Sequence, residues 1–375
     1  MATPYTWDKR NQDLKPHWLV HVPLFPNELI SSWLSRAALT HGCDPLVLTG
    51  SVFGKWRILT IDADRLHEAQ RLLPLAKISG ISIEAFNQAS LFPVAGKVCG
   101  GTPSDAVWPW ILAIGARNTK RSGGLQYCPQ CLIEDNKPYY RQEWRFAWHT
   151  TCEKHLSNLL DRCSSCNSPI EPQRLEAKDR TLRICASCKS DLSQSISQEA
   201  SKHALAFQMM ADLVVLDGTG AFHGQMLDTG KWFKLIDFFC SMIRRTNRSP
   251  SLLLRDFFSK FSVNTLANLP LVSGAGVELL RTHERIALFE AIYPLVIASK
   301  SHFEASALQS ALTRQAFCSK DETLPSVFSG LHSLLPDNSR KRGKNIRRSK
   351  FKPRPRNEVV LMMARLQRKL KMAER

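Results

Sequence analysis

The sequence contains four short pairs of cysteine or histidine residues, Cys128-Pro-Gln-Cys131, Cys152-Glu-Lys-His155, Cys163-Ser-Ser-Cys166 and Cys185-Ala-Ser-Cys188. Two residues separate the members of each pair, a spacing at which a tight turn aims both side chains at one ion. Zinc in structural sites takes four thiolate or imidazole ligands arranged as a tetrahedron. Two pairs therefore make one closed site, and the four pairs predict two structural Zn²⁺ ions.

The pairs can combine sequentially or in a cross-braced order, and the spacing is compatible with both. Only one pair contains a histidine, so either order gives one site of four cysteines and one of three cysteines and a histidine. Because protein ligands fill all four positions, neither site has a place for a reactive water, and both are predicted to be structural. The alternatives are redox-active C-x-x-C pairs or scattered buried thiols, which the regular spacing disfavours.

The remaining cysteines and the aromatic residues near the pairs are interpreted as packing residues. His149 is an alternative metal ligand, but it breaks the two-residue spacing and is interpreted as an ordinary polar residue. The unpaired cysteines are predicted to be small buried hydrophobic residues: Cys43, Cys99, Cys240 and Cys318. Five aromatic residues in the first cysteine loop are predicted to pack against it, with base stacking as the alternative: Tyr139, Tyr140, Trp144, Phe146 and Trp148.

The charge of the chain is concentrated at its C-terminal end. The 375 residues include 51 Lys and Arg against 33 Asp and Glu, a net charge of +18, and residues 340–375 hold +13 of it. Such a balance favours a polyanionic partner, of which nucleic acid is the commonest. The residues predicted to contact nucleic-acid phosphates are Arg340, Lys341, Arg342, Lys344, Arg347, Arg348, Lys350, Lys352, Arg354 and Arg356. A merely solubilising tail is the alternative.

The composition predicts a soluble, intracellular protein without a membrane segment. No stretch approaches the roughly 18 apolar residues that a membrane-spanning helix needs, and the first residues lack the pattern of a signal peptide. Eleven cysteines in a reducing compartment are poor disulfide candidates, and seven of them fall between residues 128 and 188. This clustering favours metal binding.

The hydrophobic pattern predicts a mainly α fold with two or three packed units. Four regions are expected: an N-terminal helical region with helix-turn-helix-like units (1–123), a double zinc-binding region (124–195), a C-terminal helical domain (196–336) and a basic tail (337–375). Residues 38–45 and 76–82 each look like a helix end, a Gly turn and a new helix start, as in helix-turn-helix units. Plain packing of helical hairpins is the alternative to a DNA-reading role.

Individual elements are predicted from apolar spacing. A first helix is expected over 27–39 with Asn27 as its N-cap, a short strand over 57–61, a helix over 62–73, a loop over 96–105 and core residues over 108–114. Helices are predicted over 204–216, 232–245, 281–299 and 303–312. Residues 340–356 are predicted to be disordered when alone, and 358–372 to form an amphipathic helix.

No enzyme motif is present in the sequence. A phosphate-binding G-x-x-x-x-G-K-[ST] loop, a dinucleotide fingerprint, a His-Glu-x-x-His motif and a Gly-x-Ser-x-Gly motif are all absent. The acidic residues form no recognisable metal-dependent nuclease signature. The chain is therefore predicted not to be an enzyme.

The chain resembles the TniQ/TnsD family of transposon target-selection proteins, and its length favours the TniQ branch. Four segments carry the resemblance, together with Trp144: Pro26-Asn-Glu-Leu-Ile-Ser-Ser-Trp33-Leu-Ser-Arg36, Tyr127-Cys-Pro-Gln-Cys-Leu132, Cys152-Glu-Lys-His155 and Leu160-Asp-Arg-Cys163-Ser-Ser-Cys166. The likeness covers most of the chain, is most specific over 124–192 and is weakest in the tail.

The resemblance implies an adaptor between a target and the transposition machinery. Family members pair zinc modules with helix-turn-helix units and engage an AAA+ ATPase of the TnsC/TniB type, which engages the transposase. Some bind target DNA directly, and others join an RNA-guided CRISPR Cascade-type complex, often as a dimer. The segment around Trp33 and Arg36, with the zinc region, is expected to face the ATPase. The alternative is a free-standing, sequence-specific, zinc-containing DNA-binding regulator.

Overall fold

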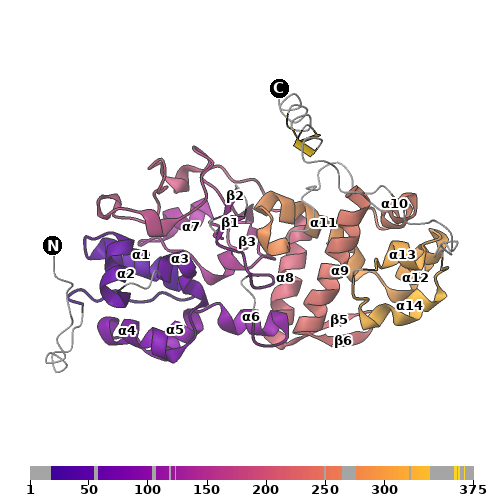
Figure 1. Ribbon diagram of the computed structural model, residues 1–375, viewed down its shortest axis with the longest axis horizontal. Coiled ribbons are helices and arrows are strands. Elements are labelled where there is room, and N and C mark those ends of the chain that lie inside the picture. The colour runs from indigo at the N-terminus through magenta and orange to yellow at the C-terminus, as the bar shows by residue number, and fades with distance from the viewer. Residues whose placement is uncertain are drawn as a thin grey trace. The chain divides into compact units, whose positions relative to one another are not determined.

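Helices dominate the part of the chain that the structure describes, as the apolar pattern predicts. The computed structural model describes residues 18–54, 58–103, 107–117, 120–122, 124–248, 251–263, 276–320, 322–337, 359–360, 362–363 and 367. The chain divides into two units, Met1–Asp337 and Asn338–Arg375. The elements described next belong to the first unit (Figure 1).

Six short α-helices and one 3₁₀ turn form the N-terminal part of the first unit. Their bounds are α1 Ile30–Thr40, α2 Pro45–Phe53, α3 Ile58–Ile61, η2 Ala63–Arg65, α4 Ala69–Ser79, α5 Ile83–Ala89 and α6 Phe92–Cys99. Apolar side chains of this part form one core around the fully buried Trp33 and Phe86, whose rings meet edge to face at 5.0 Å.

At both predicted junctions a helix ends, a glycine turn follows and a new helix begins, whereas the helix-turn-helix character of these units stays a prediction. Gly42 lies between α1 and α2 with a φ of 69°, and Pro45 occupies the first turn of α2. Gly80 ends α4 with a φ of 74°, and the Ser82 side chain caps α5 by accepting a hydrogen bond from Ala85 N–H. Glycine adopts this left-handed conformation without strain, which is why the helices end there. The DNA-reading role of these junctions stays a prediction.

Four local predictions in this part are wrong. Asn27 is not a cap, because it has a φ of 54° and α1 begins three residues later at Ile30. Residues 58–61, expected to belong to a strand, form helix α3. The helix expected over 62–73 is replaced by the 3₁₀ turn η2 and by α4, which begins at Ala69. The loop expected from Gly96 begins only after Cys99, where α6 ends.

The middle of the unit consists of loops, short hairpins and turns. Its elements are β1 Gly115–Arg117, β2 Lys120–Ser122, α7 Pro129–Glu134, η3 Gln142–Arg145, β3 Thr151–Cys152, β4 Ser157–Asn158, η4 Pro172–Arg174, η5 Ala177–Asp179 and η6 Leu192–Gln194. The β1–β2 and β3–β4 pairs are antiparallel hairpins, with Gly115 opposite Ser122 and Thr151 opposite Asn158. This region has little regular structure of its own, so its shape depends on its core and on the cysteine clusters.

The C-terminal part is helical, as predicted. Its elements are α8 Lys202–Asp217, β5 Thr219–Phe222, β6 Gln225–Asp228, α9 Thr229–Arg248, α10 Leu252–Ser259, η7 Val277–Leu279, α11 Thr282–Ile297, α12 Lys300–Gln309, α13 Arg314–Phe317, η8 Ser326–Phe328 and α14 Ser329–Leu334. The four predicted helices correspond to α8, α9, α11 and α12. The β5–β6 hairpin and α10 were not predicted.

Helices α8, α9 and α11 pack against one another (Figure 1). Aromatic side chains contribute much of the core between them. Phe207 of α8 stacks on Phe289 of α11 at a ring distance of 4.6 Å and lies near Trp232 of α9. Helix α6 packs on α9 through two glycines. A Cβ on Gly230 would lie 2.8 Å from the Cα of Gly100, so this contact admits no side chain at Gly230.

Buried arginines connect the three hydrophobic cores of this unit. Arg145 of η3 pairs with Asp62 and Asp64 of the N-terminal part at 2.7 Å each. Arg285 of α11 is fully buried and donates to the carbonyl oxygens of Ala147 and His149 in the middle region. Burial lowers the pKa of Arg285 to about 10. The predicted domain boundaries at 123, 195 and 336 stay a prediction.

The remaining predictions concern the termini and the membrane. Among the described residues, no helix is long and apolar enough to cross a membrane. Residues 340–356 lie outside the described part, so their contacts with nucleic acid stay a prediction. Within the helix predicted over 358–372, Val359, Val360, Met362 and Met363 are helical and exposed.

Candidate metal centres

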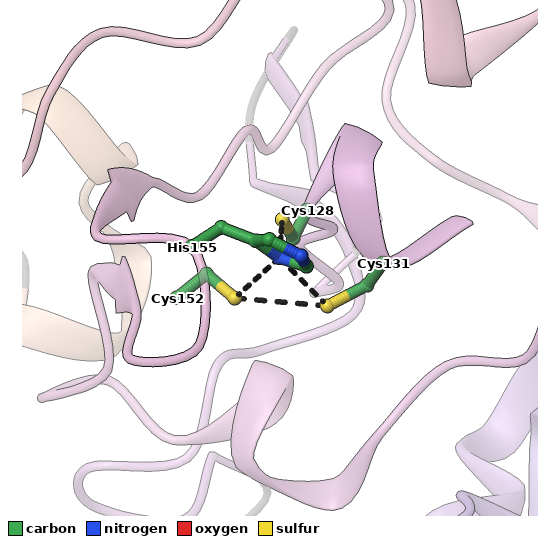
Figure 2. A group of neighbouring side chains, drawn as sticks. All are labelled: Cys128, Cys131, Cys152 and His155. Carbon is green, nitrogen blue, oxygen red and sulfur yellow. Dashed lines mark hydrogen bonds between the residues drawn. The ribbon is translucent and has the colours of Figure 1, made fainter. Parts of the chain in front are cut away.

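The first cluster joins Cys128 and Cys131 with Cys152 and His155 (Figure 2). His155 Nδ1 lies 3.3 Å from the Sγ of Cys128 and 3.4 Å from the Sγ atoms of Cys131 and Cys152. The Sγ atoms of Cys131 and Cys152 are 3.6 Å apart. Four ligand atoms thus point toward one common centre from two separate elements.

Local structure explains how these four side chains converge. Cys128 precedes α7 and Cys131 lies in its first turn, with Pro129 at the helix start. Cys152 ends β3, and the chain turns back into β4 through Leu156, which has a φ of 47° directly after His155. The turn therefore places Cys152 and His155 on the side that faces α7.

A carboxylate supports the histidine of this cluster. The second ring nitrogen of His155, Nε2, lies 3.0 Å from Oε1 of Glu134 at the end of α7. Lys154 pairs with the other carboxylate oxygen of Glu134. Metal-ligating histidines commonly have a carboxylate next to the nitrogen that does not bind the metal, which fixes the ring orientation. The sequence offered no signal for this role of Glu134.

The second cluster joins Cys163 and Cys166 with Cys185 and Cys188. The Sγ atoms of Cys163 and Cys188 are 3.7 Å apart, as are those of Cys166 and Cys185. Cys163 and Cys185 are buried, whereas Cys166 and Cys188 are exposed. This cluster therefore lies nearer the surface than the first.

Two similar turns build the second cluster. In each turn the residue after the second cysteine has a left-handed backbone, with a φ of 55° at Asn167 and 62° at Lys189. The N–H of Asn167 donates to the Cys163 carbonyl, and the N–H of Lys189 donates to the Cys185 carbonyl, both at 2.9 Å. These turns fold the chain back so that both cysteines of a pair face the same point.

Hydrogen bonds favour the thiolate form of two cysteines in this cluster, Cys163 and Cys188, whereas burial raises the pKa of Cys185. The Ser190 hydroxyl lies 3.2 Å from the Sγ of Cys163 and 3.0 Å from the Sγ of Cys188. Burial alone would raise the pKa of Cys163, but hydrogen bonds from Ser190 and from backbone N–H groups outweigh it and lower that pKa to about 6. The same hydroxyl lowers the pKa of Cys188. A thiolate is the form in which cysteine binds metal.

The geometry of both clusters fits a tetrahedral zinc site. Ligands at about 2.3 Å for sulfur and about 2.1 Å for nitrogen give tetrahedral edges of roughly 3.5–3.8 Å. The Sγ–Sγ separations of 3.6 and 3.7 Å and the Nδ1–Sγ separations of 3.3–3.4 Å lie close to these values. The clusters combine neighbouring pairs along the chain, so the order is sequential and not cross-braced.

A third group of polar side chains lies beside the first cluster. His149, Glu153 and Asp212 bring their ligand atoms within 4.8 Å of one another, and His149 Nε2 lies 2.8 Å from Oδ1 of Asp212. Burial would lower the pKa of His149, but the charges of Asp212 and nearby glutamates raise it. An ion pair with Asp212 explains this arrangement. Because 63 residues separate the partners, the sequence could not indicate it.

The aromatic residues of the first cysteine loop pack inside the protein, as predicted. Tyr140, Trp144 and Trp148 are buried, and Tyr139 and Phe146 are half-buried. Phe146 stacks on Trp148 at 4.7 Å. The three buried rings offer no surface for base stacking.

The side chains of Trp33 and Arg36 lie inside the protein, and the expectation that the segment around them, with the zinc region, faces the ATPase stays a prediction. Trp33 is fully buried and donates from Nε1 to the Val22 carbonyl. Arg36 forms a buried ion pair with Glu28 at 2.6 Å. Of the four cysteines outside the two clusters, Cys240 is buried as predicted, whereas Cys43, Cys99 and Cys318 are only half-buried.

The fold and the sites define the class of the protein. It is mainly helical and has two closed, cysteine-rich clusters, each of which could hold a metal ion. Residues 19–159 match the TniQ family model. The chain therefore carries a TniQ domain in its N-terminal and middle parts. The match includes all four residues of the first cluster and ends before the second. The comparison with curated proteins found no match.

Proposed function

We propose that this chain is a non-enzymatic target-selection adaptor for DNA transposition. It links target DNA, or an RNA-guided Cascade-type complex, to an AAA+ ATPase of the TnsC/TniB type and so to the transposase. The observation that carries the proposal is the TniQ domain over residues 19–159, which includes a complete set of metal ligands. The adaptor works in the bacterial cytoplasm and acts as a single chain or as a dimer.

Each cysteine-rich cluster binds one structural Zn²⁺ in this proposal. All four positions of each tetrahedron are filled by protein side chains, so neither ion has an open position for a substrate or a water. The ions hold together a region that has few regular elements, and they supply folding free energy instead of chemistry. The regions 1–123, 124–195, 196–336 and 337–375 then serve as separate binding surfaces on one chain.

The basic tail holds DNA in this proposal. Residues 340–375 carry a net charge of +13, and Lys and Arg side chains bind phosphates without reading the base sequence. Several weak contacts on one chain raise the effective concentration of the ATPase at the target. The adaptor therefore needs no tight affinity for any single partner.

Recruitment of the ATPase to target DNA tests the proposal. Target DNA is fixed to beads together with its targeting complex, and the purified ATPase is added with or without this chain. The proposal predicts ATPase retention only when the chain is present. Cys152→Ser, which removes a ligand of the first cluster, is expected to abolish retention, whereas Cys43→Ser, a cysteine outside both clusters, is expected to retain it. ATPase retention that is independent of the chain would contradict the adaptor function.

A free-standing DNA-binding regulator is the second candidate. The helical junctions α1–α2 and α4–α5, each with a glycine in the turn, favour it. A sequence-specific regulator binds its site about 10³–10⁷ times more tightly than random DNA. An adaptor that relies on the basic tail would show little preference between the two, so competition binding on both DNAs separates the candidates.

A further inference from the structure

The two cysteine clusters differ in their exposure to solvent. All three cysteines of the first cluster are buried, and its histidine is half-buried. In the second cluster Cys166 and Cys188 are exposed, whereas the other two cysteines are buried. A dissolved oxidant reaches a cysteine from solvent, so oxidation follows exposure as well as thiolate character. The second cluster is therefore the one that such an oxidant attacks.

Each exposed cysteine of the second cluster has a buried cysteine next to it. The Sγ of Cys188 lies 3.7 Å from the Sγ of Cys163. The Sγ of Cys166 lies at the same distance from the Sγ of Cys185. An oxidised cysteine forms a disulfide when a second thiolate is close enough to attack its sulfur. The cluster therefore contains two sets of an exposed cysteine that meets the oxidant and a buried cysteine that completes the disulfide.

The loop between the two cysteine pairs, residues 167–184, connects the second cluster with the N-terminal helices. Its turns η4 and η5 pack against α1, and η4 also packs against α2. The Ala177 N–H donates to Oδ1 of Asp44, the residue before α2, at 2.7 Å. Leu175 shares a hydrophobic core with Leu39 of α1. A change in the cluster therefore acts on the surface where this loop covers α1 and α2.

We propose that Cys166 and Cys188 are sites of reversible oxidation by a peroxide. Their oxidation to disulfides releases the Zn²⁺ of the second cluster and loosens the loop over α1 and α2, while the first cluster keeps its ion. The inference rests on the zinc binding of the proposed function and goes beyond it, and it does not depend on a role in transposition.

The oxidation balances with hydrogen peroxide as the oxidant. The Cys188 thiolate attacks one peroxide oxygen, so that an S–O bond forms, the O–O bond breaks and hydroxide leaves. The Cys163 thiolate then attacks the Cys188 sulfur, so that the disulfide bond forms and the second oxygen leaves as hydroxide. Two protons from solvent convert both hydroxides to water. The two thiolates lose two electrons, which the peroxide gains. The same steps apply to Cys166 and Cys185.

A disulfide is incompatible with the tetrahedron of zinc ligands. Its sulfur atoms lie about 2.05 Å apart, whereas those of Cys163 and Cys188 are separated by 3.7 Å. The sulfur atoms of a disulfide also lack the negative charge with which a thiolate binds metal. With two of the four ligands lost, the ion dissociates. The folding free energy that the ion supplied to this loop is lost with it.

Zinc release during peroxide treatment tests the proposal. The metal content of the full chain is measured first, and hydrogen peroxide is then added in the presence of a chromophoric zinc chelator. We expect about two ions per chain at the start, and release of one of them at least about tenfold faster than the other. Mass spectrometry after differential alkylation should find disulfides between Cys163 and Cys188 or between Cys166 and Cys185. A dithiol reductant and added Zn²⁺ should restore about two ions.

A matched control variant removes the half-buried cysteines outside both clusters, Cys43→Ser, Cys99→Ser and Cys318→Ser together. It should release zinc as the wild type does. Two ions at the start and no release, release of both ions at equal rates, or disulfides confined to the first cluster would overturn the oxidation and leave the proposed zinc sites intact. One ion at the start, held by the first cluster, would contradict the proposed second zinc site itself, and the inference would fall with it.

Hydrogen exchange follows the loop in the same samples. A peptide that covers residues 171–182 should take up deuterium at least about tenfold faster after peroxide treatment, because amides exchange faster where local structure opens more readily. A peptide from α11, away from the cluster, is the control and should not change. Unchanged exchange over 171–182 after zinc release would overturn the link between the cluster and the N-terminal helices.

Discussion

Replacing Arg145 by methionine should strongly destabilise the protein. The guanidinium is 1% exposed and donates to both Asp62 oxygens, to Asp64 and to the Leu112 carbonyl at 2.7–3.1 Å. Methionine fills much of the same volume but carries no charge and no donor. The substitution therefore leaves two carboxylates buried, with side-chain exposures of 8% and 1%.

The size of the effect follows from burial. Removing one partner of a buried ion pair costs about 3–5 kcal/mol, because the remaining charge stays buried without compensation. In a domain of 150–250 residues 1 kcal/mol shifts the Tm by about 2–4 °C, so a loss of roughly 10 °C is expected. Arg71→Met is the matched control. Its ion pair with Glu68 has a similar length, 2.8 Å, but both side chains are about half exposed, so its loss costs at most ~1 kcal/mol.

The destabilisation should depend on pH. Burial raises the pKa of Asp64 to about 6, with Arg145 opposing the shift and the negative charge of Asp62 adding to it. Without Arg145 this pKa rises further. A carboxyl group whose folded pKa lies above its unfolded value of about 4 stabilises the fold below pH 4 and loses that contribution as pH rises through the folded pKa. The loss in Arg145→Met is therefore expected to be smaller at pH 5 than at pH 8.

Thermal unfolding followed by tryptophan fluorescence at pH 5 and pH 8 measures these differences. Wild type, Arg145→Met and Arg71→Met are compared in the same buffers and with the same zinc content. A Tm of Arg145→Met within 2 °C of the control at pH 8 would refute the reasoning. An equal loss at pH 5 and pH 8 would refute the assignment of the pH dependence to the buried carboxylates.

Three further predictions follow from other parts of the molecule. Elemental analysis of the pure protein should find about two zinc ions per chain, and fewer than about 1.5 ions would contradict the prediction of two zinc sites. Cys163→Ser should lower the zinc content to about one ion and unfold the second cluster, because a closed site contributes ~10 kcal/mol to folding. Removing residues 340–375 should weaken binding to all DNA sequences alike and make the affinity less dependent on salt, since each neutralised phosphate contributes about 0.9 to the slope of log affinity against log salt concentration. An unchanged slope after the truncation would mean that the tail has another role. Gly230→Ala should lower the free energy of unfolding, measured by chemical denaturation, by about 1–3 kcal/mol, because the new Cβ clashes with Gly100. Gly50→Ala is the control and should be neutral or stabilising, because Gly50 is exposed and has no close neighbours.

The cysteine clusters show what could be predicted from the sequence. The pairs are local, because the two residues between their members dictate a turn, and so the ligand sets were predictable. The order in which pairs combine depends on the fold of the loops between them, which the spacing does not determine. Glu134 and Ser190 contact the predicted ligands through the folded structure, and their sequence positions carry no signal for it.

The helices show the same division between local and long-range information. Long apolar patterns such as those of α8 and α11 predicted helices to within a few residues. Residues 58–61 are rich in β-branched side chains and were predicted as a strand, yet tertiary packing makes them helix α3. Arg145 lies 81 residues from Asp64, so their buried pair could not be derived from a local pattern.

Mapping of insertion sites in cells tests the adaptor function most directly. Cells carry the transposon ends, the ATPase and the transposase, and contain the intact gene, no copy of this gene, or the Cys152→Ser variant. Sequencing of all insertion junctions then gives both their frequency and their positions. We predict that insertions cluster at the target only with the intact gene, and that the deletion and Cys152→Ser lose this clustering. Unchanged frequency and positions after deletion of the gene would contradict the adaptor function.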